Sequence, residues 1–330
     1  MNLAVVRAGV FTSVQAGPRL GARRFGVSSG GALDLVALRV LNTMVANEPP
    51  AALLEITAGV VRLKVDDPRL IAWLGGNYEV RCRQASIPAG HVARLDEGEE
   101  LVLSGPSEGY RAWLAISGGI DVPEILGNRS TDLRGHFGGR HGRALRDGDF
   151  LSLGAHSPRA RVLLGRLKER GLGDWGAPFE WSHPFAGPPV LHFVRGRDWD
   201  SFDRSSLETF SATTFSVDGE SDRMGVRLHG HSLRRTEEAD LVSEAVAPGT
   251  IQVPPGGEPI LLLGDCQTIG GYPKLAHVIT ADLPRAAQLR PGEGVMFHEI
   301  SLSDAYARLW QVERDLAKFA IGLEIAHRCA

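Results

Sequence analysis

The sequence predicts a mainly β protein with two β-rich halves and few helices. Short apolar segments end repeatedly at glycine, proline or aspartate along most of the chain, and only two longer segments carry a helical period. Many short strands with frequent turn residues are typical of β-barrels and sandwiches, not of a doubly wound α/β sheet. A glycine- and proline-rich stretch near the middle suggests a division into two parts.

The predicted strands follow one another at short intervals in both halves. Each is a run of apolar and β-branched residues that stops at a turn residue such as Gly75, Gly118 or Gly154. The clearest of them span residues 70–74, 110–116, 150–153, 190–194, 251–253, 260–263 and 295–300.

One helix is predicted within residues 32–46. Five apolar residues recur there with helical spacing: Leu33, Val36, Val40, Leu41 and Met44. Asp34 stands near the start, where an acid caps the first turn or complements the helix dipole.

A second helix is predicted at the C-terminus, with Ser303 as its N-cap. Its apolar stripe has the 3,4 spacing of an amphipathic helix and consists of Leu309, Val312, Leu316, Phe319 and Leu323. Such a stripe favours packing on the helix's own domain, and a helix that binds a partner is the alternative.

The stretch at residues 171–189, GLGDWGAPFEWSHPFAGPP, is the predicted linker. It divides the chain into an N-terminal subdomain, residues 1–175, and a C-terminal subdomain with the final helix, residues 176–330. The two halves have no evident internal repeat.

Composition predicts a soluble protein without nucleic-acid or membrane partners. The 330 residues are 43% hydrophobic and 23% charged with a net charge of −3, which gives no attraction to polyanions. The start MNLAVVRAGV is unlike a signal peptide, and no apolar run reaches the length of a membrane span. Three distant cysteines, Cys82, Cys266 and Cys329, fit reduced thiols, so we expect a cytoplasmic location.

Several familiar motifs are missing or weak. There is no Walker A loop, and neither HExxH nor paired CxxC occurs, so no metal site is predicted. His229 and His231 alternate as solvent-facing strand residues do, with a metal pair as the less favoured alternative. The GVSSG run at 26–30 matches G-x-S-x-G but lacks the apolar strand that a nucleophile elbow needs. None of the four lysines follows a methionine, so no covalent biotin is expected.

Three polar clusters occupy predicted turns. They read SDRMG at 221–225, GNRSTD at 127–132, and DCQTIGGYPK at 265–274. Adjacent Asp and Arg residues often serve as salt bridges that hold a loop, whereas mixed polar loops on a rigid β scaffold are frequent binding sites. Both readings stay open from the residues alone.

Long blocks of the chain resemble one family. They are GVSSGGALDLVALRVLNTMVANEPPAALLEIT (26–57), WLAISGGIDVPEILGNRSTD (113–132), GRALRDGDFLSLG (142–154), SDRMGVRLHG (221–230), and the region 249–297 that contains QTIGGYPK. Together they resemble the allophanate hydrolase subunit 2 family, also called the biotin-dependent carboxyltransferase-like or antagonist-of-KipI family.

The resemblance implies a fold and a function. It implies two cyclophilin-like β-barrel subdomains that together form one carboxyltransferase-like domain. It also implies the C component of an ATP-dependent 5-oxoprolinase, a hydrolase that opens the cyclic amide 5-oxo-L-proline to L-glutamate. The implied partners are a LamB/YcsF-type protein as the A component and a KipI-like protein (allophanate hydrolase subunit 1) as the B component. ATP has no located site in this chain.

Two alternatives remain. One is a carboxyltransferase component that takes carboxybiotin from a separate carrier and uses a urea-like acceptor. The other is a non-catalytic regulatory partner of a KipI-like protein, which needs only a protein interface.

The candidate site residues come from the polar clusters that carry the resemblance. Lactam opening needs donors that stabilise a developing oxyanion and an acid or base that handles protons. The predicted catalytic residues are Asp222, Arg223, Asp265 and Lys274. The predicted substrate-binding residues are Ser29, Asp34, Arg129, Ser130, Thr131, Gln252, Gln267, Thr268, Gly270, Gly271 and Tyr272.

Overall fold

The computed structural model describes residues 1–49, 51–83, 85–178, 181, 189–237 and 241–329. By its internal contacts the chain divides into two compact units. The first contains residues 1–19, 34–184 and 315–330, and the second contains residues 20–33 and 185–314. The two subdomains 1–175 and 176–330 stay a prediction.

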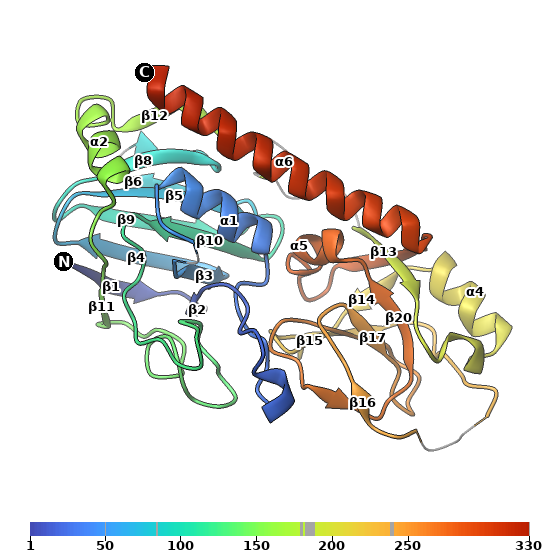
Figure 1. The fold of residues 1–330 in the computed structure, drawn as a ribbon. Coiled ribbons are helices and arrows are strands. Elements are labelled where there is room, and N and C mark those ends of the chain that lie inside the picture. The colour runs from blue at the N-terminus through green and yellow to red at the C-terminus, as the bar shows by residue number, and fades with distance from the viewer. Residues whose placement is uncertain (50, 84, 179–180, 182–188, 238–240, 330) are drawn as a thin grey trace. The chain divides into compact units, whose positions relative to one another are not determined.

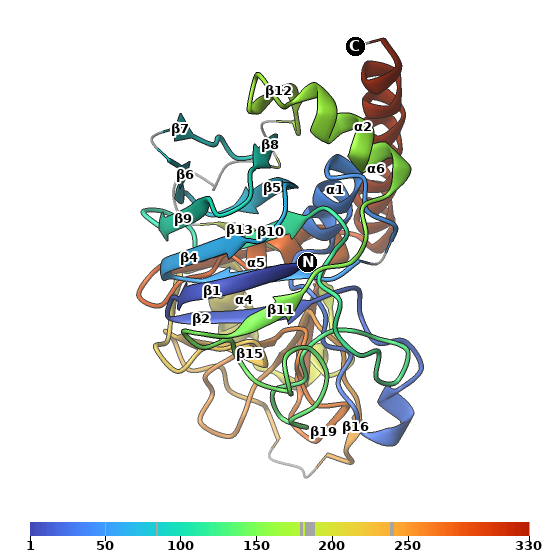
Figure 2. The same ribbon diagram turned by 90° about the vertical axis from the view of Figure 1, so that its left-hand side faces the viewer.

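The first unit contains two six-stranded sheets, in which all the recorded strand pairings are antiparallel. In strand order, one sheet consists of β11 (Phe150–Ser152), β1 (Asn2–Ala8), β4 (Gly59–Val65), β9 (Glu100–Gly105), β6 (Glu79–Cys82) and β7 (Ala85–Ser86). The other consists of β12 (Leu172–Gly176), β8 (His91–Leu95), β5 (Arg69–Gly75), β10 (Arg111–Ile116), β3 (Leu53–Thr57) and β2 (Phe11–Gln15). Figure 2 shows β1, β4 and β9 side by side in the first of these sheets.

Both faces of β10 are buried. Alternate residues such as Ala112 and Leu114 belong to the core formed by side chains of both sheets. The opposite face, with Trp113, lies under helix α1 (Leu35–Met44), which packs across β10 and β5 (Figure 1). A strand covered on both faces needs a nearly continuous apolar run, and RAWLAI supplies it.

The second unit is built around a closed barrel. Its strands, in order around the barrel, are β13 (Val190–Arg195), β20 (Lys274–Val278), β17 (Thr250–Gln252), β18 (Ile260–Leu262), β15 (Gly225–His229), β14 (Phe215–Val217) and β21 (Gly294–Glu299). The parallel pairing of β13 with β21 closes the ring, so no strand edge of the barrel is left open. A separate two-stranded ribbon pairs β16 (Glu244–Ala245) with β19 (Ile269–Gly270).

Strand register identifies the inner face of the barrel. Val226 lies opposite Leu261, Leu261 opposite Ile251, and Ile251 opposite Ala276. All four side chains are at most 1% exposed. Residues next to them along each strand therefore point outward.

An aromatic cluster fills one part of this unit. Phe210, on helix α4 (Arg204–Ala212), stacks on Phe297 with ring centroids 4.7 Å apart and meets Phe193 and Phe215 at larger angles. Asp203 caps the helix by accepting the amide hydrogen of Ser206. The cluster joins the helix to three strands of the barrel.

The remaining helices are short, apart from the last. Besides α1 and α4 the described residues contain α2 (Pro158–Arg166), α5 (Leu283–Ala286) and α6 (Leu302–Cys329), with 3-10 turns at Arg23–Phe25, Trp199–Ser201 and Thr280–Asp282. Among the described residues, none of the helices combines the length and apolar character that crossing a bilayer requires.

Helix α6 confirms the predicted C-terminal helix but not its cap. Ser303 lies inside the helix, and Ser301 caps it by accepting the amide hydrogen of Asp304 at 3.1 Å. Both serines are N-cap residue types, but only Ser301 precedes the first helical residue, Leu302, as an N-cap must. Leu316 and Leu323 of the predicted stripe are buried, which confirms that this face packs on the protein.

The mainly β prediction is confirmed, and one of the two predicted barrels is present. Within the described residues the sheets of the first unit are open, because β11, β7, β12 and β2 each stand at a sheet edge without a closing partner there. The predicted linker is wrong at residues 172–176, which form β12 and pair with β8. Residues 179–180 and 182–188 of that stretch lie outside the described part of the chain.

Phe210→Ala should destabilise the second unit by about 3–5 kcal/mol, because it removes a fully buried ring and leaves a cavity. Urea unfolding followed by tryptophan fluorescence measures the effect. The control is Phe25→Ala, whose ring is 71% exposed and whose loss should change stability by less than about 0.5 kcal/mol. Equal midpoints for the two variants would contradict the placement of Phe210 in the core.

Candidate functional site

The outer face of β17 and β20 carries a row of polar side chains. Gln252 pairs with Lys274, and Thr250 pairs with His277, so the register shifts by one residue between the two pairs. This irregularity gives β20 one extra residue and turns Lys274 and His277 to the same side of the ladder. Thr250 donates to or accepts from His277 Nδ1 at 3.2 Å.

Lys274 is a buried cation. Its side chain is 5% exposed, and its ammonium lies 3.5 Å from Glu244 on β16. Its backbone amide donates to Asp198 Oδ2 at 2.8 Å, which fixes the start of β20. Glu244 also pairs with the exposed Arg197. Burial and the nearby positive charge of Lys274 lower the pKa of His277 below its usual value, which favours the neutral imidazole.

Gln252 links two parts of the QTIGGYPK loop. Its Nε2 donates to the Tyr272 carbonyl at 3.1 Å, and its Oε1 accepts from Gln267 Nε2 at 3.1 Å. A Cβ on Gly270 would lie 2.7 Å from Gln252 Nε2, so any larger residue there would displace the Gln252 amide. Thr268 contributes its carbonyl, which accepts the amide hydrogen of Val246.

Arg223 and Asp265 form a buried bidentate ion pair. The two nitrogen–oxygen distances are 2.9 and 3.0 Å, and both side chains are less than a tenth exposed. Arg223 also donates to the Gly31 carbonyl at 2.7 Å. Asp222, by contrast, is exposed and accepts the amide hydrogens of Met224 and Gly225, which shapes the turn before β15.

Tyr272, unlike the buried Lys274, is exposed and faces a cavity. Its ring is 47% exposed and lines a cavity of about 770 Å³, together with Gly271. Two consecutive arginines, Arg234 and Arg235, line the same cavity. The loop thus contributes to two places in the second unit, a charged cavity and the polar face with Lys274.

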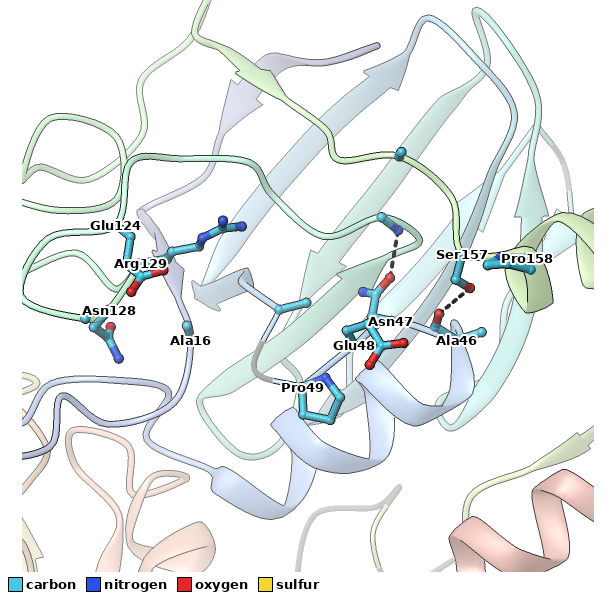
Figure 3. Close-up of a pocket in the computed structure, with 14 residues that line it drawn as sticks. Ala16, Ala46, Asn47, Glu48, Pro49, Glu124, Asn128, Arg129, Ser157 and Pro158 are labelled. Carbon is cyan, nitrogen blue, oxygen red and sulfur yellow. Dashed lines mark hydrogen bonds between the residues drawn. The ribbon is translucent and has the colours of Figure 1, made fainter.

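The residues of the first-unit cluster GNRSTD also have two kinds of surroundings. Ser130 and Thr131 are buried and tie the loop to its neighbours: Ser130 Oγ accepts the Ala16 amide at 2.8 Å, and Thr131 Oγ1 donates to the Val14 carbonyl at 2.9 Å. Gly139 makes room for this, since a Cβ there would lie 2.0 Å from Thr131 Oγ1. Arg129 instead lines a cavity of about 460 Å³ (Figure 3).

Asp34 and Ser29 were also predicted to bind substrate. Ser29 is almost buried, and Arg23 donates to its Oγ at 3.4 Å. Asp34 caps α1 by accepting the Ala37 amide hydrogen at 2.8 Å, as the sequence predicts. Burial, reinforced by the negative charge of Glu55, raises the pKa of Asp34 to about 6. This carboxyl therefore changes charge just below neutral pH.

Comparison with known proteins places the chain in a family. Residues 25–299 match the family described as carboxyltransferase domain, subdomain A and B. The chain belongs to this family. It is 37% identical over 304 residues to the C component of the Escherichia coli 5-oxoprolinase, a match that covers 92% of this chain and 93% of the relative. The corresponding Haemophilus influenzae component is 32% identical over 288 residues, or 87% of each chain.

A solved structure of the family has the same fold. The urea carboxylase of Kluyveromyces lactis superposes with a TM-score of 0.84 at 28% identity and covers 96% of this chain. This chain spans only 29% of that enzyme. The likeness therefore concerns one part of a longer protein.

The sequence did not reveal the partners of the predicted residues. Glu244 and Asp198 contact Lys274 from positions 30 and 76 residues earlier, and neither stands in a recognisable motif. The pair of adjacent cations Arg234 and Arg235 is a signal that is visible in the sequence itself. The predicted catalytic and binding roles themselves stay predictions.

Asp34→Asn should remove a pH dependence of stability. Because the pKa of Asp34 is about 6 in the folded state and 3.8 as a free side chain, the folded state binds more protons between those values. Stability should thus fall as pH rises from about 4 to 6, by about 3 kcal/mol in total. Asparagine keeps the helix cap without titrating.

The measurement is urea unfolding of both proteins across this pH range, with the exposed Asp174→Asn as control. The wild type and the Asp174 variant should lose stability relative to Asp34→Asn as pH rises. Parallel stability curves for all three proteins would show that Asp34 does not titrate in this range.

Proposed function

We propose that this chain is the C component of an ATP-dependent 5-oxoprolinase that converts 5-oxo-L-proline to L-glutamate. The observation that carries the proposal is the 37% identity, over nearly the whole of both chains, to the C component of the E. coli 5-oxoprolinase. A component of that kind acts with others, so the proposal includes a KipI-like B component and a LamB/YcsF-type A component. Catalysis is assigned to the complex, not to this chain alone.

The chemical task is to weaken a resonance-stabilised amide. As the lactam opens, negative charge develops on its carbonyl oxygen, and fixed donors in a site shielded from water stabilise that charge most effectively. Lys274 fits this task. Its ammonium has three N–H donors, and the carboxylate of Glu244 at 3.5 Å is the ion-pair partner recorded in the described part of the chain. Donors therefore remain for a carbonyl oxygen.

The neighbouring groups hold Lys274 in place. Asp198 fixes its backbone, and Glu244 balances its charge. Gln252 and Gln267 connect the strand to the glycine loop. We assign these four residues to positioning.

Arg223 and Asp265 take a positioning role in this proposal as well. Each uses its charged atoms on the other, so neither offers a ready donor or base to a substrate. Asp222 keeps the role of a proton carrier, since its carboxylate is exposed although it also shapes a turn.

No step involving ATP is assigned to this chain. Phosphate sites commonly combine a glycine-rich loop with a helix N-terminus. The run Ser28 to Gly31 precedes α1, but the cap of that helix is Asp34, whose negative charge at neutral pH opposes phosphate. We therefore expect the nucleotide on a partner protein of the complex.

A second candidate function is carboxyl transfer from carboxybiotin to a urea-like acceptor. The likeness to K. lactis urea carboxylase favours it, as does the cavity beside Tyr272. At about 770 Å³ that cavity exceeds the need of 5-oxo-L-proline, and Arg234 and Arg235 suit a bound carboxylate.

The proposal predicts glutamate formation from 5-oxo-L-proline and ATP only when this chain is combined with both partner proteins. Lys274→Met in this set should lower kcat at least about a hundredfold, the usual loss when one oxyanion donor is removed. The matched control is Lys168→Met, which removes an exposed lysine and should leave kcat unchanged. Glutamate is quantified by coupled enzymatic assay.

Two results would count against it. Glutamate formed at the full rate without this chain would remove it from the 5-oxoprolinase. Full activity of Lys274→Met in a folded complex would remove the role of the lysine, while labelled carboxyl transfer to urea without glutamate formation would favour the second candidate.

A further inference from the structure

The first unit has a cavity of its own that the proposed function does not use. It measures about 460 Å³, and four segments form its walls: the residue after β2, the loop after α1, the connection from β10 toward β11, and the loop into α2. Its lining residues are Ala16, Ala46, Asn47, Glu48, Pro49, Ala51, Gly118, Glu124, Gly127, Asn128, Arg129, Ala155, Ser157 and Pro158. A volume of this size suits a small organic ligand.

Hydrogen bonds fix the walls without any ligand. The Asn47 amide donates to Asn42 Oδ1 and to the Ile116 carbonyl, both at 2.9 Å, and accepts the Gly118 amide hydrogen at 2.7 Å. Ser157 caps α2 and donates to the Ala46 carbonyl at 2.7 Å. The side chains of Asn47 and Ser157 already form hydrogen bonds within the protein. We therefore expect the charged residues to recognise a ligand.

The opposite wall is held in the same manner. The Asn128 amide donates to the Gly17 carbonyl at 2.8 Å and accepts the Ser130 amide hydrogen at 2.7 Å. This fixes the backbone on either side of Arg129. The side chain of Arg129 therefore extends from a backbone that is held in place at the cavity wall.

Three charged side chains line the cavity. Arg129 and Glu124 come from one wall and Glu48 from the other, and the guanidinium of Arg129 extends into the space between them (Figure 3). The ion pair of Arg129 is a loose one, 3.7 Å to Asp121, which lies outside the lining. Among the described residues, the carboxylates of Glu48 and Glu124 have neither a hydrogen-bond nor an ion-pair partner. Charges of both signs therefore face one small space.

We propose that this cavity binds a small zwitterion of the α-amino acid class. The ligand carboxylate pairs with Arg129, whose planar fork matches a carboxylate, and the ligand ammonium pairs with Glu48 across the cavity. Glu124 adds a second negative charge beside Arg129. The cavity thus carries one cation and two anions and disfavours a ligand with a second carboxylate. The proposal does not rest on the 5-oxoprolinase assignment.

The test is calorimetric titration of the purified full chain at low ionic strength. The probes are L-glutamine, a zwitterion with a neutral side chain, L-glutamate, which adds a carboxylate, and 5-oxo-L-proline, which lacks the ammonium. L-glutamine should bind with a Kd of about 1 mM or tighter. At this cavity L-glutamate should bind more weakly, and 5-oxo-L-proline should bind weakest.

Matched variants locate the binding. Arg129→Met and Glu48→Gln should each weaken L-glutamine binding at least about tenfold, or about 1.4 kcal/mol. Arg146→Met removes an exposed arginine of the same unit and should leave the affinity unchanged. Circular dichroism checks that each variant is folded. Because Glu48 is exposed, Glu48→Gln should fold normally and provides the test even if Arg129→Met is unstable.

Three outcomes would overturn the proposal. The first is no saturable binding of L-glutamine up to about 20 mM. The second is equal affinity of the wild type, Arg129→Met and Glu48→Gln. The third is binding of 5-oxo-L-proline that is tighter than that of L-glutamine and is lost in Arg129→Met, which would show that the cavity does not select for an ammonium.

Discussion

The buried ion pair between Arg223 and Asp265 is the interaction on which the polar groups of the second unit depend. Arg223 stands just before β15 and Asp265 just after β18, and these two strands are neighbours in the barrel. The pair therefore sets where the loop toward Lys274 begins, and a third bond from Arg223 holds Gly31. Removing one member leaves a buried charge uncompensated, which costs about 3–5 kcal/mol. Retention of such a pair is understandable where it fixes a loop.

From that anchor, two backbone features shape the polar face. Gly270 lets the loop pass against Gln252, and the extra residue in β20 turns Lys274 toward the same side as His277. Lys274 is thus positioned by backbone geometry and by Glu244, before any substrate binds. Preorganised donors of this kind need no rearrangement when charge develops on a carbonyl oxygen.

Local features of the structure could be predicted from the sequence, and long-range ones could not. The strand runs end at turn residues, and Asp34 caps α1, because these properties depend on neighbours in the chain. Closure of a sheet into a barrel depends instead on whether its two edge strands pair with each other. No short stretch of sequence shows this, so the open sheets of the first unit could not be predicted. The N-cap of α6 is Ser301 and not Ser303, so even a helix start predicted from local sequence was displaced by two residues.

The candidate site follows the same division. The family resemblance pointed to the loops, but adjacent residues within a loop have different surroundings. Arg129 faces a cavity, whereas Ser130 beside it is fully buried and hydrogen-bonded to the backbone. Tyr272 likewise faces a cavity whereas Lys274 is buried, and Glu244 becomes relevant only once the ribbon of β16 and β19 is seen. The sequence pattern alone does not show which way each side chain of a loop faces.

The central claim is that Lys274 polarises the lactam carbonyl, and isotope-edited infrared spectroscopy tests it most directly. The measurement compares 5-oxo-L-proline, labelled with ¹³C at the lactam carbonyl, bound to the complete complex that contains either the wild-type chain or Lys274→Met. The account predicts a lower carbonyl stretching frequency in the wild-type complex than in water, and a return toward the water value in the variant. The same frequency in both complexes would contradict it.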